Sequence, residues 1–184
     1  HGYINSFEKA IETTARLMPK AFLTRVFQGT EDQQNRRIFF IRHGGIRGCP
    51  LSKIGVTDLI EWCQRRSEAN VWALVASGIS LWEKSDGNRD GFSIKSSAVE
   101  FLEAAPEPEP VLNAYADRVT QSSWSGSRSD VMQSRADAIA ELTKHEGEEI
   151  AQAARSVSDR LSMELERERV CDQQRDEERE QRFE

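Results

Sequence analysis

The stretch TEDQQNRRIFFIRHGG, residues 30–45, decides between two folds for this chain. Its centre, residues 38–41 (IFFI), has the bulky apolar composition of a buried strand. Its ends favour a helix, because Thr30 and Gln33 match a capping box and the glycine pair at 44–45 is typical of a helix C-terminus. Since both ends carry helix signals, we predict a helix here and keep the strand as the alternative.

The residues before this stretch predict two further helices. Pro19 divides them, because it ends the first helix and suits the first position of the second. Ser6 is the predicted N-cap of the first helix, and Gly29 is the predicted residue just beyond the end of the second. The apolar residues at helical spacing are Phe7, Ala10, Ile11, Leu17 and Met18 in the first, and Phe22, Leu23, Val26 and Phe27 in the second.

The residues after the stretch alternate between loops and short helices. Glycines and a proline predict a loop at 44–56, after which Thr57 is the predicted N-cap of a short helix. The apolar segment 71–82 fits either a helix that contains Gly78 or two short strands. Residues 85–91, rich in Asp, Asn and Gly, predict an exposed loop.

Two more helices are predicted before the last one. A second capping box, residues 97–100, begins the first of them. Pro110 is the predicted first residue of the next helix. A polar loop at 120–127 then leads into a helix that ends before Gly147.

The last helix is predicted to have two halves. Its first half carries one apolar stripe suited to packing on the preceding helix, with Ile139 and Leu142 as expected neighbours. From residue 164 to the end, nine acids and five arginines contribute −4 to the formal charge of −6. This half predicts a solvated helix, so removing residues 170–184 is expected to leave the melting temperature nearly unchanged. The stripe consists of Ile150, Ala154, Val157, Leu161 and Leu165.

These segments predict an all-α fold. About nine short helices follow one another as antiparallel pairs, which is typical of a HEAT- or armadillo-like array. The predicted domains are a helical-repeat domain at residues 1–163 and a charged helical tail at residues 164–184.

Composition limits the class of protein. The 184 residues are 38% hydrophobic and 30% charged, and no apolar run approaches the ~20 residues of a membrane-spanning helix, so we expect no membrane partner. The three cysteines are odd in number and lack a CxxC spacing, which predicts free thiols and a reducing, cytoplasmic location.

The three histidines are far apart, so we expect no metal site and no cofactor. The chain begins with His rather than Met, which suggests a piece of a larger protein.

One local cluster of cations stands out from the near-neutral body. Between residues 36 and 53 there are five cations and no acid, so an anion or a nucleic acid would be sought there. Trp124, in a polar loop, is either a candidate anchor for a neighbouring domain or a core residue that fills a space between helices. The candidate binding residues are therefore Arg36, Arg37, Arg42, Arg47, Lys53 and Trp124.

The stretch SSWSGSRSDVMQSRADAIAELTKHEGEEIAQAARS, residues 122–156, with the charged tail after it, resembles the C-terminal end of large bacterial multidomain proteins. In those proteins HEAT-like helices follow an NTPase or another effector module, and many resemble antiphage defence components. The resemblance covers roughly residues 106–184. It implies a bacterial defence-system component, while the absence of a Walker A motif leaves the NTPase function unassigned.

A second resemblance is local. Residues 38–44 (IFFIRHG) look like the strand and Arg-His-Gly motif of the histidine phosphatase family, and residues 50–55 (PLSKIG) are similar to a later motif of that family. The resemblance implies a central sheet, with His43 as the phosphoryl-accepting nucleophile and Arg42 as a phosphate ligand. The family's second His-Gly is absent, since Glu146 follows His145, and we predict no phosphatase activity.

The predicted function is a non-catalytic scaffold or interaction domain. No acid pair, nucleophile triad or glycine-rich phosphate loop has a spacing suited to catalysis. The expected partner is a protein or another domain of the parent chain. The alternatives are a phosphoryl hydrolase that uses Arg42 and His43, and an anion- or nucleic-acid-binding module that uses the basic cluster at 36–53.

Overall fold

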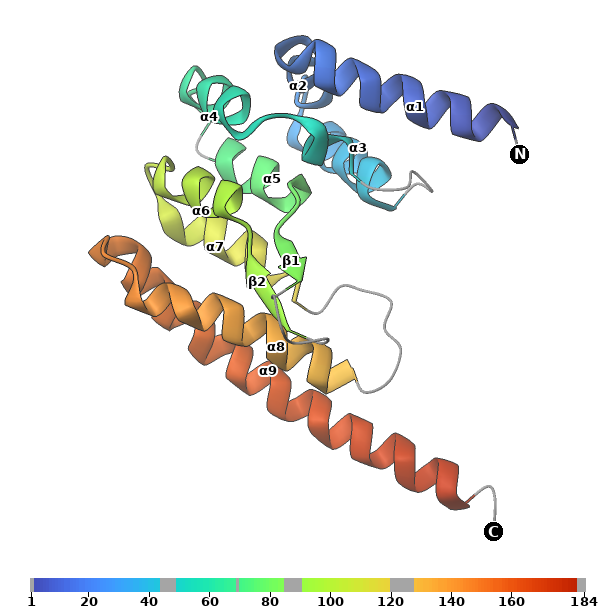
Figure 1. Cartoon of the computed structure of the whole chain (residues 1–184), viewed down its shortest axis with the longest axis vertical. Coiled ribbons are helices and arrows are strands. Elements are labelled where there is room, and N and C mark those ends of the chain that lie inside the picture. Colours follow the sequence, from blue (N-terminus) through green and yellow to red (C-terminus); the bar gives the residue numbers. More distant parts are fainter. Residues whose placement is uncertain (1, 44–48, 69, 85–90, 120–127, 182–184) are drawn as a thin grey trace. The chain divides into compact units, whose positions relative to one another are not determined.

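The computed structural model describes residues 2–43, 49–68, 70–84, 91–119 and 128–181 (Figure 1). Helix accounts for 77% and strand for 4% of the described residues. The prediction of a mostly helical chain is therefore confirmed, with one short two-stranded sheet in addition. The arrangement as HEAT-like repeats stays a prediction.

The chain divides into two compact units. Unit 1 comprises His1–Leu81 and Lys95–Val111, and unit 2 comprises Trp82–Ile94 and Leu112–Glu184. The predicted division at residue 163 stays a prediction, and helix α9 runs through that point without a break.

Unit 1 consists of short helices. Three of them, α2, η1 and α7, begin with a proline, and α4 follows extended backbone at Gly55. Their bounds are α1 (Gly2–Leu17), α2 (Pro19–Val26), α3 (Glu31–His43), the 3₁₀ helix η1 (Pro50–Lys53), α4 (Val56–Gln64), α5 (Val71–Gly78) and α6 (Ser96–Glu103), followed by the start of α7 (Pro108–Ala116).

The helix formed by the stretch around residue 38 is confirmed. Helix α3 covers residues 31–43, and the backbone N–H of Thr30 donates to Gln33 Oε1 at 3.3 Å, as a capping box requires. The predicted end at glycines 44–45 lies outside the described residues. Because residues 38–41 are helical, the strand that the phosphatase resemblance implies at this place is absent.

Four predicted helix starts are wrong. Ser6 lies inside α1, which begins at Gly2, and Thr57 lies inside α4, whose N-cap is Gly55. The box at 97–100 lies inside α6, whose N-cap is Lys95 with no side-chain cap bond. Extended backbone at Gly55 and at Lys95 starts these helices instead. Helix α7 begins at Pro108 rather than Pro110, because a proline fits anywhere in a first turn where the N–H groups lack helical partners.

Aromatic contacts hold the core of unit 1. The rings of Phe27 and Trp62 lie 5.2 Å apart, and Trp62 Nε1 donates to Thr24 Oγ1 at 3.2 Å. The rings of Trp72 and Phe101 lie 5.0 Å apart. These pairs pack the end of α2 against α4 and α5 against α6, since each ring buries a large apolar area at a contact between helices.

In the segment 71–82 the helix is confirmed and the alternative of two short strands about residues 77–78 is wrong. Helix α5 occupies residues 71–78, and strand β1 (Trp82–Lys84) begins four residues after Gly78. Strand β1 pairs antiparallel with β2 (Phe92–Ile94), with Glu83 opposite Ser93. The predicted loop between these strands lies outside the described residues, apart from Gly91.

The β-pair packs on helix α8 (Arg128–Ala140) in unit 2. The guanidinium of Arg135 lies over the rings of Phe92 and Trp82, at 4.9 and 5.8 Å from their centroids. The backbone N–H of Phe92 donates to Ser134 Oγ at 3.0 Å. Burial lowers the pKa of Arg135, and the two aromatic faces offset part of the desolvation of its charge.

The predicted apolar stripe of the last helix is confirmed. Helices α8 and α9 (Glu148–Gln181) lie side by side (Figure 1), joined through the 3₁₀ helix η2 (Glu141–Lys144). Ile139 and Leu142 are buried where α8 and η2 meet α9. All five stripe residues are buried: Ile150, Ala154, Val157, Leu161 and Leu165.

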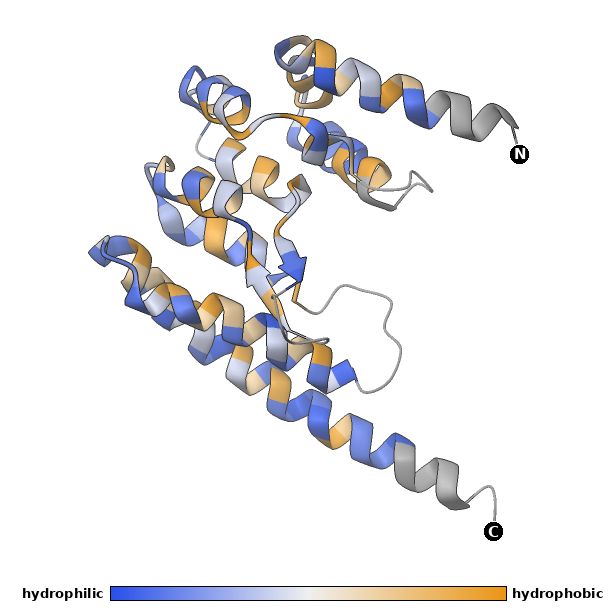
Figure 2. Ribbon diagram, in the orientation of Figure 1, coloured by the Kyte–Doolittle hydropathy of each residue, from blue (hydrophilic) through white to orange (hydrophobic). Residues whose placement is uncertain are grey.

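Beyond Leu165, helix α9 is mostly hydrophilic (Figure 2), yet part of it is docked. Asp172 Oδ2 accepts from the backbone N–H of Ser129 at 2.9 Å, and Glu168 Oε2 lies 3.1 Å from Arg128 Nη1. Arg175 Nη2 binds Glu168 and Asp172 together, at 2.5 and 2.6 Å. The expectation of a wholly solvated second half is therefore wrong for Glu168 and Asp172, while the residues between them are exposed. We call residues 168–175 the α8 clasp.

Candidate interaction groove

The predicted basic cluster does not form one patch among the described residues. Arg36 and Arg37 lie on α3, and Lys53 ends η1. Arg42 and His43 occupy the last turn of α3, with side chains outside what the structure describes. Arg47 and Trp124 also lie outside the described residues.

Arg37 has a structural partner rather than a free cationic end. Its Nη1 donates to the backbone carbonyls of Val26 at 2.8 Å, Gln28 at 2.5 Å and Arg25 at 3.2 Å. These carbonyls belong to the end of α2, where a helix leaves its last carbonyls without internal partners. Arg37 therefore ties α3 to α2, which reduces its value as an anion ligand.

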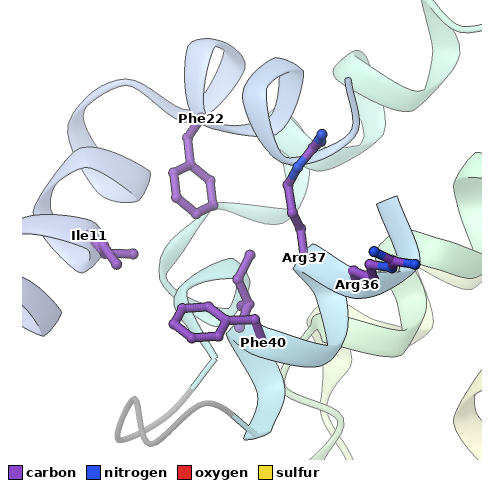
Figure 3. Close-up of a pocket in the computed structure, with 6 residues that line it drawn as sticks. Ile11, Phe22, Arg36, Arg37 and Phe40 are labelled. Carbon is purple, nitrogen blue, oxygen red and sulfur yellow. The ribbon is translucent and has the colours of Figure 1, made fainter. Parts of the chain in front are cut away.

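Beside this contact, helices α1, α2 and α3 border an apolar groove of about 300 Å³. Figure 3 shows the side chains of Ile11, Phe22 and Phe40 turned toward the same hollow. The guanidinium of Arg37 runs from α3 toward α2, and Arg36 points away, so both arginines contribute their aliphatic stems. The groove is lined by Ile11, Phe22, Arg36, Arg37, Phe40 and Ile41.

The spacing of the α3 residues explains how the sequence builds one wall of this groove. Residues 36, 37, 40 and 41 share one helical face, because neighbours three and four apart lie together on a helix. Ile41 and Ile38 are buried, whereas Phe40 is 52% exposed and fills the groove only in part. Phe39, 67% exposed, belongs to another side of the helix and does not line the groove.

A second, polar hollow lies on another face of α1. It has a volume of about 240 Å³ and is lined by three cations with one acid. None of the three cations has an ion pair with another described residue. The lining residues are Lys9, Glu12, Thr13, Arg16 and Lys53.

Lys53 is thus brought together with cations that the sequence analysis did not select. Lys9 and Arg16 join it from α1, because η1 packs against that helix. Sequence reasoning assigned Ile11 and Phe22 to helix cores, and it missed their part in the groove. Their apolar periodicity predicts a buried face, yet Leu17 and Met18 of the same periodic set are 68% and 59% exposed. Periodicity does not tell which neighbour, if any, covers such a face.

Other kinds of site find no support in the described part of the chain. Among those residues no group of three or more His, Cys, Asp or Glu side chains is placed to hold a metal ion. The same residues include no helix with the length and apolar character needed to cross a membrane. Burial raises the pKa of the Cys63 thiol to about 12, which makes it a poor nucleophile at neutral pH.

Comparisons with protein-family models, with curated proteins and with solved structures find no match to this chain.

Proposed function

We propose that this chain is a non-catalytic helical interaction domain that binds a protein partner through the apolar groove of unit 1. One observation carries the proposal: Phe40 is half exposed in a groove whose other described lining groups are apolar side chains and arginine stems. A half-exposed aromatic residue in such a hollow is typical of the energetic centre of an interface.

The chemistry of the groove favours binding over catalysis. Among the residues whose side chains the structure describes, those that line it include no acid, thiol, hydroxyl or imidazole group. Its two cationic groups point away from the hollow, one of them toward backbone carbonyls (Figure 3). Proton transfer and nucleophilic attack both need a titratable or nucleophilic group at the reacting atom.

The sequence resemblance supports a wider setting for this domain. In that setting the chain is the helical part of a larger bacterial protein, with helix pairs arranged as HEAT-like repeats. Solenoids of this kind present extended surfaces to partners. Other domains of the parent protein are then further candidates for the occupant of the groove.

The test is a selection of ligands from a display library of helical peptides with randomised surface positions. We expect the selected peptides to bind the chain with a micromolar Kd, about −8 kcal/mol, and to lose at least tenfold in affinity to Phe40→Glu. Phe39→Glu is the matched control, because it makes the same change one residue away and outside the groove. Selected peptides that bind both variants equally would place the binding surface elsewhere and refute the proposal.

A second candidate function is anion contact through the polar hollow at Lys53. The convergence of Lys9, Arg16 and Lys53 favours it. Titration with a single-stranded oligonucleotide tests it: the Arg16→Glu variant should weaken binding, and the same affinity in both proteins would reject this candidate.

A further inference from the structure

Charge is distributed very unevenly around the groove. Residues 1–53 contain nine Lys and Arg against four Asp and Glu, a formal charge of +5. The remaining residues, 54–184, carry −11. The described part of the positive segment consists of α1, α2, α3 and η1, and the first three of these border the groove.

Few of these cations are neutralised inside the protein. Lys20 Nζ pairs with Glu61 at 2.8 Å. Lys9, Arg16, Arg36 and Lys53 have no ion pair with another described residue, and all four are exposed. Arg36 lines the groove, so its charge is available to a ligand there. Lys9, Arg16 and Lys53 line the polar hollow on another face of α1 and add to the positive field of this segment.

We infer that the occupant of the groove is an acidic amphipathic helix of a protein partner. This inference rests on the proposed function and adds the chemistry of the partner. The apolar face of such a helix supplies side chains that cover Phe22 and Phe40, and its acids face Arg36 and the net positive charge of residues 1–53. Positive charge around an apolar hollow attracts an acidic partner during approach and disfavours a basic one.

The size of the groove agrees with this occupant. A volume of about 300 Å³ is at the lower end for a pocket that encloses a whole small molecule. It is enough for a few bulky side chains, as a docked helix presents them at positions i, i+4 and i+7. A docked helix also covers the open side of the groove with its own backbone and its flanking side chains.

A second copy of this chain is the competing occupant, since residues 164–184 carry −4 and residues 164–181 form the end of α9. Its apolar content argues against it. In the described part of that segment the exposed large apolar side chain is Val170, which is too little for an apolar face. The partner helix is therefore assigned to another protein, and self-association becomes an outcome of the test.

The test uses the peptides selected from the helical library on the full chain. We expect them to be enriched in Glu and Asp, and replacing the acids of the best peptide by Gln should weaken it at least tenfold at about 50 mM salt. The difference should shrink at about 500 mM salt, where charges are screened. On the protein side, Arg36→Glu should weaken binding of the acidic peptide about threefold or more, whereas Arg155→Glu, the same change at an exposed residue of α9, should not.

The outcomes separate this inference from the proposed function. Peptides that need Phe40 but are neutral or basic would overturn the acidic partner and leave the groove as the binding surface. Peptides that do not depend on Phe40 would overturn both. A concentration-dependent dimer in sedimentation that Phe40→Glu dissociates would assign the groove to a second copy and overturn the inference.

Discussion

Arg37 shows how one residue can look like a ligand in the sequence and serve as a connector in the fold. Its guanidinium binds three carbonyls at the end of α2, and Gln34 Nε2 donates to two more, those of Phe27 and Gly29. Gly29 has a φ of +94°, which turns the chain between α2 and α3 and favours glycine there. Two side chains of α3, Arg37 and Gln34, thus bind the carbonyls at the end of α2 and in the turn. A third, Gln33, accepts from the backbone N–H of Thr30 at the start of α3.

Replacing Arg37 by Met should destabilise the protein by about 1–3 kcal/mol, because the carbonyls of α2 lose a charged donor. Urea unfolding followed by circular dichroism measures this change. The control is Arg36→Met, which removes the same charge from an exposed neighbour and should change the free energy of unfolding by less than about 0.5 kcal/mol. Equal losses in the two variants would show that the carbonyl contacts contribute little.

The three thiols should differ sharply in reactivity. Cys63 is buried and Cys171 is exposed, with Cys49 between them. At pH 8 an aromatic disulfide reagent should modify Cys171 quickly and Cys63 only after unfolding. Fast modification of Cys63 in the native protein would contradict its burial.

The same thiol makes stability depend on pH in a known direction. Burial raises the pKa of Cys63 from 9.0 to about 12, so the folded state keeps a proton that the unfolded chain loses above pH 9. Its contribution is fully present below pH 9, and stability falls as the pH rises from 9 toward 12. The Cys63→Ala variant should show a shallower fall over this range.

At the scale of elements, the α8–α9 contact depends on the apolar stripe. Leu161 is almost completely buried, so Leu161→Ala should cost about 2–4 kcal/mol in the free energy of unfolding. Met163, two residues away and 61% exposed, is the control, and Met163→Ala should have little effect. Similar costs for both substitutions in thermal unfolding would contradict the packing of α9 on α8.

The α8 clasp changes the expected effect of shortening α9. Removing residues 170–184 takes away Asp172 and Arg175 and leaves the backbone N–H of Ser129, a nearly buried residue, without this acceptor. Loss of a helix cap costs about 1–2 kcal/mol, which lowers the melting temperature of a chain of this size by about 2–8 °C. Removing residues 176–184 retains the clasp and should change the melting temperature by less than about 1 °C.

The whole molecule should give a strongly helical spectrum. Because helix makes up 77% and strand 4% of the described residues, far-ultraviolet circular dichroism should show the double minimum of a helical protein with little strand signal. A spectrum dominated by strand would contradict the helical state of residues 31–43 in particular. That result would also restore the phosphatase alternative, which requires a central sheet.

Much of this architecture follows from the sequence alone. The helix at residues 31–43, the break at Pro19 and the buried stripe of α9 are all predictable, because each depends on neighbours within one or two helical turns. Exact helix starts were less predictable. At Lys95 and Gly55 the conformation of the preceding backbone outweighed nearby hydroxyl caps.

Only the tertiary structure decided which charged and apolar groups meet. The groove needs Ile11, Phe22 and Phe40 from three helices, and the clasp joins Ser129 to Asp172, 43 positions away. Periodicity identifies a buried face but not its neighbour, and a run of alternating charges contains no signal for the one acid that caps another helix. Such contacts depend on how helices pack, so they become visible only when the chain is folded.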